Sequence, residues 1–378
     1  MTVGEMTVNN NSNNSNNRKL AKLFAPAVLV AALWSATHPA AAQEDLTIAG
    51  GLTVVGQAIS DDAYATNGSL VDETDPEGTG NGASIIYSID VTFEKEMESG
   101  TFFLYLIGAE GDAVFDGSNA DAEGGDFENQ LVGVAEAWYE HWMFDEMLKF
   151  RIGKIDPTGI YDGNEFANDQ TTQFLADVFV NNPGILFTPY TPGMNLSLDI
   201  GEFMTMSLGM YEDDAATIAG EFQNVFFIGE LAFHYDLFDN PGNFRFTGWN
   251  SEVNDRSGFA FNLDQAMFEE MVGMFMRLGF VSNVVEELGP NELPETEVAF
   301  SLGGQITLFD DHALGLAYSL QTPSVDGWDS LSWFEAYVSF MVAEETYLSF
   351  DIQLISNPDF DAENDSIAVY GFRTQVNF

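Results

Sequence analysis

The sequence predicts an all-β protein: one antiparallel, up-and-down β-barrel of sixteen strands that crosses a membrane. Three observations support this prediction. The final segment, 366 to 378, alternates apolar and polar residues and ends on Phe378, a period of two that is typical of a strand with one apolar face. An export signal begins the chain. Short and long connections then alternate along the sequence, which favours an outer-membrane barrel over a soluble Greek-key sandwich.

The first 42 residues have the features of a cleaved export signal. A basic stretch precedes an apolar run that ends in small residues: Arg18, Lys19 and Lys22, then 23 to 34, then Pro39 to Ala42. The apolar run is too short for a spanning helix, which needs about 20 residues. We therefore expect cleavage after Ala42 and a single barrel domain over 43 to 378, with membrane crossing made by strands.

The charge balance excludes several classes of partner. Outside the signal the chain has eight Lys and Arg residues against 59 Asp and Glu residues, and it has no Cys. Nucleic acid and anionic surfaces are poor partners for such an acidic protein. Asp116, Asp121, Glu123 and Asp126 lack the spacing of a calcium-binding loop. We expect no metal and no cofactor.

Sixteen segments have the length that a tilted membrane strand needs, about 9 to 11 residues. The predicted strands cover 46 to 60, 83 to 96, 100 to 111, 131 to 145, 147 to 155, 193 to 201, 203 to 212, 225 to 238, 242 to 250, 257 to 268, 271 to 284, 295 to 308, 311 to 322, 331 to 344, 346 to 356 and 366 to 378. Their connections alternate between tight turns and longer segments, among which 251 to 256 is counted as a long one. An even number of strands places both chain ends at the short-turn rim, which is the periplasmic side of such barrels.

The longest connection, 156 to 192, follows the fifth strand. Apolar residues recur in it near helical spacing, Asp162 to Asn164 can cap a helix start, and Pro183 ends the pattern. We expect a short amphipathic helix in this third external loop, folded into the lumen with Phe174, Leu175 and Phe179 against the wall. A helix that stays outside, on a loop cap, is the alternative.

The candidate functional residues are polar side chains at the alternate strand positions that face the barrel interior, which we call the inward phase. The predicted pore-lining or constriction residues are Arg151, Arg245, Arg277, Arg373, Asp264, Glu335, Asp351 and Trp249. An arginine facing lipid near the midplane would cost about 2 to 4 kcal/mol, so the inward assignment is favoured. These charges either form ion pairs with one another across the wall or create an electric field that orients polar solutes. Trp249 could instead belong to an aromatic girdle at a membrane rim.

Several segments resemble the carbohydrate-selective porins of the bacterial outer membrane. They are Asn164 to Asp169 with Phe174, Leu175 and Phe179 to Pro183; Asp239 to Arg245; Gly258 and Phe259 with Leu263 to Gln265 and Phe275 to Gly279; and Asp351 to Gln353 with Asn357, Pro358 and Gly371 to Arg373. The resemblance implies a sixteen-stranded porin that passes monosaccharides and other small polar solutes by facilitated diffusion. It carries over Arg245, Asp264, Arg277 and Arg373 as constriction residues. The acidic excess departs from the family and puts the sugar preference in doubt.

The alternative of the same build is a non-specific or cation-selective general porin, as the charge favours. An outer-membrane enzyme is the rival from another class, but the three histidines outside the signal, His141, His234 and His312, lie in no recognisable nucleophile motif. We therefore expect no enzyme activity. The expected partners are the outer-membrane bilayer, small polar solutes, a possible homotrimer, and the barrel-assembly machinery through the strand that ends at Phe378.

Overall fold

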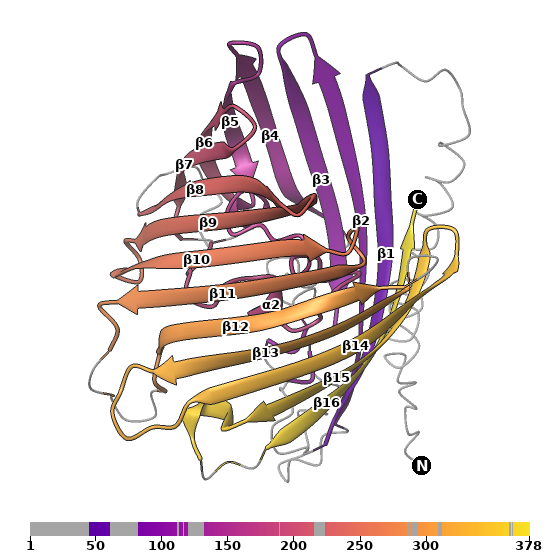
Figure 1. Ribbon diagram of the computed structural model, residues 1–378, viewed down its shortest axis with the longest axis vertical. Helices are drawn as coiled ribbons and strands as arrows, with labels where there is room; N and C mark the ends of the chain where they lie inside the picture. Colours follow the sequence, from indigo (N-terminus) through magenta and orange to yellow (C-terminus); the bar gives the residue numbers. More distant parts are fainter. Residues whose placement is uncertain are drawn as a thin grey trace, which may run out of the picture.

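The computed structural model is a closed antiparallel barrel of sixteen strands. It describes residues 45–60, 82–111, 113–115, 117–119, 132–188, 190–214, 224–285, 288, 293–308, 312–362, 364 and 366–378. The predicted signal segment lies outside these residues, as do Asp116, Asp121, Glu123 and Asp126. In Figure 1 the chain proceeds strand by strand around the barrel, from indigo β1 to yellow β16.

The strands have the following bounds: β1 (Leu46–Ile59), β2 (Ala83–Met97), β3 (Gly100–Glu110), β4 (Gly133–Met143), β5 (Leu148–Ile155), β6 (Thr191–Ile200), β7 (Met204–Glu212), β8 (Val225–Leu237), β9 (Asn240–Ser251), β10 (Arg256–Met267), β11 (Val272–Ser282), β12 (Thr296–Thr307), β13 (Ala313–Pro323), β14 (Leu331–Ala343), β15 (Thr346–Ser356) and β16 (Ile367–Asn377). Two short 3-10 helices, η4 (Pro157–Gly159) and η6 (Pro358–Phe360), and one α-helix, α2 (Asp177–Val180), lie in connections. Every predicted strand is confirmed, with ends within two residues of those expected.

The first and last strands close the sheet. β1 pairs with β16 in antiparallel register, with Val55 opposite Arg373 and Gly51 opposite Asn377. Because every strand then has two hydrogen-bonded neighbours, the sheet has no free edge. The final strand therefore has the orientation that its alternation predicts. Val369 and Arg373 are buried inside, and Tyr370 and Phe372 are exposed outside.

Short turns and longer connections alternate around the barrel as predicted, with one exception. The connection between β9 and β10 comprises only residues 252 to 255 and forms a turn, so its assignment as a long connection is wrong. Among the described residues no helix has the length and apolar character needed to cross a membrane.

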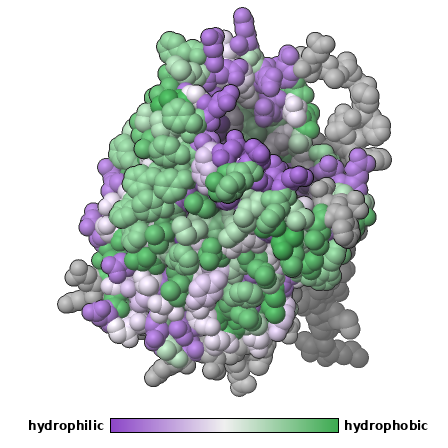
Figure 2. Space-filling model, viewed as in Figure 1, coloured by the Kyte–Doolittle hydropathy of each residue, from purple (hydrophilic) through white to green (hydrophobic). Residues whose placement is uncertain are grey.

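The outer wall is apolar over most of its height. In the face shown in Figure 2, hydrophobic side chains cover the broad middle, and hydrophilic ones gather mainly toward the upper and lower margins. On β10 and the neighbouring strands the phenylalanine rings form a continuous contact network, in which the rings of Phe259 and Phe280 stack with centroids 4.8 Å apart. An exposed apolar band of this kind is what a lipid-facing barrel surface requires.

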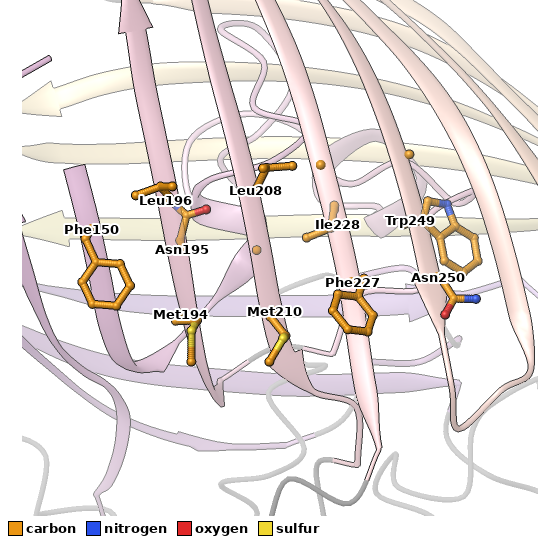
Figure 3. A pocket seen from close by; sticks show the side chains of 13 residues that line it. Phe150, Met194, Asn195, Leu196, Leu208, Met210, Phe227, Ile228, Trp249 and Asn250 are labelled. Carbon is orange, nitrogen blue, oxygen red and sulfur yellow. The ribbon is translucent and has the colours of Figure 1, made fainter. Parts of the chain in front are cut away.

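A shallow apolar cavity of about 600 Å³ lies on this outer wall over β5 to β9. Met194, Leu196, Leu208, Met210 and Phe227 line it (Figure 3). Leu196, Leu208 and Phe227 are among the exposed hydrophobic residues, whereas the next inward positions are buried. The cavity therefore belongs to the lipid-facing surface and is separate from the interior polar site.

Candidate functional site

The connection between β5 and β6, residues 156 to 190, enters the barrel and packs on its inner wall. We call it the inward loop. Phe174, Leu175 and Phe179 are 0 to 1% exposed. The ring of Phe174 lies 5.0 Å from that of Tyr337 on β14 and 5.6 Å from that of Phe275 on β11. The predicted packing of these three residues inside the barrel is confirmed.

The helix in this loop is shorter than the sequence pattern indicates. Only Asp177–Val180 is α-helical, and Asp162 to Asn164 do not cap it. The reason is that wall side chains bind the backbone groups that a longer helix would use for itself. Leu175 N and Ala176 N donate to Glu335, while the carbonyls of Ala167 and Phe179 accept from Arg277. Hydrogen bonds to the wall therefore hold the loop in addition to its own, such as the one from Gln173 N to the Asp169 carbonyl.

Arg277 is the centre of the first anchoring cluster. Its Nε donates to Asp162 Oδ2 at 2.8 Å and its Nη2 to the Asp162 carbonyl at 3.1 Å. Asn262 on β10 donates through Nδ2 to Asp162 Oδ1 at 2.8 Å and accepts from Asn164 Nδ2 at 2.7 Å. Asp162 N in turn donates to Glu230 Oε2 on β8 at 2.8 Å. Three strands thus fix the start of the inward loop.

Glu335 and Arg373 form the second anchoring cluster, on β14 and β16. The two carboxylate oxygens of Glu335 accept from Leu175 N at 2.7 Å and from Ala176 N at 2.9 Å. Arg373 donates to the carbonyls of Gln170 at 2.7 Å and Gln173 at 2.8 Å. The wall carboxylate thus accepts from backbone N–H groups of the loop, and the wall arginine donates to its carbonyls. This pairing fixes the position of the loop along the wall.

A third cluster lies on the wall formed by β3, β4 and β5. The rings of Phe103 and Trp138 stack with centroids 4.8 Å apart, and the Arg151 guanidinium lies 3.8 Å from the Trp138 ring centroid. Arg151 Nη2 pairs with Glu140 Oε2 at 2.9 Å, and Trp138 Nε1 donates to Glu136 at 3.0 Å. Apolar ring faces and paired charges are therefore placed side by side on the inner wall.

All eight predicted site residues lie on the inner side of the barrel, but most of them do not reach open space. Trp249, Asp264, Arg277, Glu335, Asp351 and Arg373 are 0 to 8% exposed. These six are packed within the wall or under the inward loop, and Asp264 in addition lines a cavity beside Gln173 of that loop. Their role in lining or narrowing the pore stays a prediction. Trp249 Nε1 donates to the Gly184 carbonyl at 2.9 Å, so the girdle alternative is wrong for it.

Arg151 and Arg245 retain some access, with side chains 21% and 13% exposed. Arg245 Nη1 lies 2.5 Å from Asp264 Oδ2, and Asn243 Nδ2 donates to the other oxygen of the same carboxylate. A constriction role for Arg151 and Arg245 stays a prediction. Sequence reasoning missed Asp162, Asn262 and Phe103. The inward phase of Asn262 on its strand was the available signal, whereas nothing in the sequence pairs Asp162 with Arg277.

Every basic residue outside the predicted signal is engaged. Six form ion pairs: Lys95 with Asp45, Lys149 with Asp199, Arg151 with Glu140, Arg245 with Asp264, Arg256 with Glu295, and Arg277 with Asp162. Arg373 binds loop carbonyls and Lys154 donates to the Val134 carbonyl. No Lys or Arg side chain outside the predicted signal is thus left without an ion pair or hydrogen bond, whereas carboxylates outnumber these basic groups.

Cavities meet the inward loop from both rims, and two of them lie on either side of residues 170 and 171. The outer cavity, about 460 Å³, opens toward the rim of long connections and is lined by Ile107 and Gln170 among others. The inner cavity, about 600 Å³, lies toward the rim of short turns and is lined by Tyr105 and Thr171. Gln170 and Thr171, which are adjacent in the loop, therefore line different cavities, as do Ile107 and Tyr105 of β3. The burial of Asp156, which also lines the outer cavity, raises the pKa of its carboxyl despite hydrogen bonds from Thr158.

Comparisons with known proteins agree with the fold. No protein-family profile matches the chain. An uncharacterized protein of Aquifex aeolicus (strain VF5) is 25% identical over 226 residues, which cover 60% of this chain and 63% of the relative.

Solved structures give the clearest likeness. Pseudomonas putida OprB superposes with a TM-score of 0.68 at 12% identity, covering 89% of this chain and 94% of that one. A mutant of the Rhodopseudomonas blastica porin gives a TM-score of 0.56 at 12% identity, covering 88% of this chain and 100% of that one. At such identities the similarity concerns architecture, and the chain has the sixteen-stranded barrel fold of these porins.

Proposed function

We propose that the chain is an outer-membrane porin that forms a water-filled channel for facilitated diffusion of sugars and other small polar solutes. The observation that carries this proposal is the pair of cavities on either side of the inward loop. Gln170 and Ile107 line the outer one, and Thr171 and Tyr105 line the inner one. A solute route between the inward loop and β3 would join them.

The apolar outer wall supports placement in a bilayer, and the likeness to solved porins supports a channel rather than an enzyme. Sugars are supported by the cluster of Phe103, Trp138 and Arg151, because an aromatic face beside hydrogen-bonding groups suits the C–H face and hydroxyls of a sugar. A homotrimer, and assembly through the strand ending at Phe378, remain proposals that the barrel permits.

Reconstitution tests the channel. The purified full chain should swell sugar-loaded liposomes and produce single-channel currents in planar bilayers. Swelling should be fastest for monosaccharides and slower for larger oligosaccharides, because the inward loop narrows the lumen. Tightly sealed vesicles and silent bilayers, from protein that migrates on gels as a folded barrel, would refute the proposal.

A cation-selective general porin is the second candidate. The observation that favours it is the engagement of every basic residue in ion pairs or hydrogen bonds, which leaves no uncommitted cation to attract anions. Reversal potentials under a potassium chloride gradient separate the two candidates. A general porin should show ion preference alone, whereas a sugar channel should in addition show current block by a sugar.

A further inference from the structure

A buried amide donor without a partner lies in the wall of the outer cavity. Asn182 follows α2, lines this cavity and is 1% exposed. Its Oδ1 accepts from Gly184 N at 3.0 Å, which fixes the oxygen end of the amide. Its Nδ2 has no hydrogen-bond partner among the described residues. A buried donor in this state is unfavourable, so a group that accepts a hydrogen bond from it would be stabilised there.

The rest of the cavity lining combines polar groups with the apolar side chains of Ile107, Val178, Val180, Pro183, Ile185 and Leu186, and it carries no Lys or Arg. It includes the amides of Asn168, Gln170 and Asn181, the hydroxyl of Thr158, and the carboxylates of Asp156 and Asp177. The aromatic rings of Phe187 and Tyr190 also line it. Its volume of about 460 Å³ is within the range of roughly 300 to 1,000 Å³ that is usual for small-molecule sites. Convergent polar groups beside aromatic rings are the composition expected for a polyhydroxylated ligand.

We propose that the outer cavity is a binding site for neutral or positively charged polyhydroxylated solutes and that it discriminates against negatively charged ones. This inference rests on the proposed channel function and specifies its substrate class. A hydroxyl or ring oxygen accepts from Asn182 Nδ2, and hydroxyl or ammonium groups donate toward Asp156 and Asp177. A sugar acid or sugar phosphate would meet these two carboxylates and find no basic side chain in the lining, which is a repulsive element against that class.

Current block tests the inference. Glucose, glucosamine and gluconate have similar size and differ in charge, and each is added to the full-length channel in planar bilayers. Glucosamine should block at lower concentration than glucose, and gluconate should not block over the same range. Block by gluconate equal to that by glucose would overturn the inference, as would a conducting channel that none of the three blocks. A preparation without any conductance would instead overturn the proposed channel and this inference with it.

Two variants locate the site. Asn182→Ala should raise the half-blocking glucose concentration roughly five- to tenfold, the loss expected for one buried hydrogen bond. Asn250→Ala is the matched control, because Asn250 is exposed and lines the cavity on the outer wall. Asp177→Asn should retain glucose block and remove the advantage of glucosamine. If both cavity variants responded to each of the three solutes as the wild type does, the site would lie elsewhere and the inference would be refuted.

Discussion

Arg277 on β11 and Asp162 in the inward loop form an ion pair, with Nε and Oδ2 2.8 Å apart, in which the side chains are 0% and 3% exposed. The pair joins the barrel wall to the start of the loop, and the same guanidinium also binds the carbonyls of Ala167 and Phe179. Removal of one partner of such a pair leaves a buried charge without compensation.

Arg277→Ala should therefore release the start of the inward loop. We expect a loss of roughly 3 to 5 kcal/mol in the free energy of unfolding, as for other broken buried pairs, and a larger, noisier single-channel conductance. Urea titration followed by gel mobility measures the first effect, and bilayer recording measures the second. Arg256→Ala is the control, since its partner Glu295 is 40% exposed and exposed pairs contribute about 0 to 1 kcal/mol. Unchanged conductance and selectivity in Arg277→Ala would contradict the assignment of Arg277 to loop anchoring.

The second anchor depends on the charge state and shape of Glu335. Glu335→Gln retains one acceptor oxygen for the amides of Leu175 and Ala176 but turns the other acceptor into a donor that faces an N–H group. Hydrogen exchange at these two amides should become about tenfold faster, which corresponds to the loss of one hydrogen bond. Glu345→Gln, in the turn before β15, should leave their exchange unchanged. Equal exchange in Glu335→Gln and the wild type would show that hydrophobic packing alone holds the loop.

The Arg151 and Glu140 pair offers a test of how wall charges set ion preference. Arg151→Ala leaves Glu140 without its partner and should increase the preference for cations, whereas Glu140→Gln frees Arg151 and should decrease it. Reversal potentials in a potassium chloride gradient measure both changes. We expect shifts of opposite sign. Shifts of the same sign, or none, would place this pair away from the route that ions take.

Ion preference should also depend on pH. Burial raises the pKa of Asp156, so this carboxylate takes up a proton at a higher pH than an exposed aspartate, whose pKa is about 3.9. The negative charge that it contributes to the outer cavity is present above the raised pKa and is lost as the pH falls through it. The preference for cations should decrease over that interval. Asp156→Asn should remove this part of the pH dependence, and Asp255→Asn, in the turn between β9 and β10, should retain it.

The barrel could be predicted from the sequence because each strand carries its own evidence. Alternation on 366 to 378 and the inward phase of Arg277 and Arg373 are local patterns, and lipid on one side fixes which face is apolar. The entry of the inward loop could be predicted as well, since Phe174 and Phe179 are too apolar for a free loop.

The extent of the helix and the accessibility of the site could not be predicted in this way. Both depend on contacts between residues far apart in the chain. Glu335 removes Leu175 N and Ala176 N from any longer helix. The inward loop packs against Arg277 and Arg373, two of the four arginines that the pattern assigned to the pore. The inward phase identified the correct face of the wall, but the loop decides which residues of that face meet solvent.

Close contact between two glycines provides the last test of loop anchoring. A Cβ atom built on Gly279 of β11 would lie 2.6 Å from both Gly184 Cα and Asn182 Oδ1 of the inward loop. Gly279→Ala should therefore push this part of the loop off the wall and weaken the hydrogen bond from Trp249 to the Gly184 carbonyl. Gly248→Ala is the matched control, since a Cβ there meets nothing within 4 Å. We expect a shifted tryptophan emission and an altered conductance in Gly279→Ala only. Identical behaviour of the two variants would mean that the wall yields at Gly279 and that the loop keeps its place by other contacts.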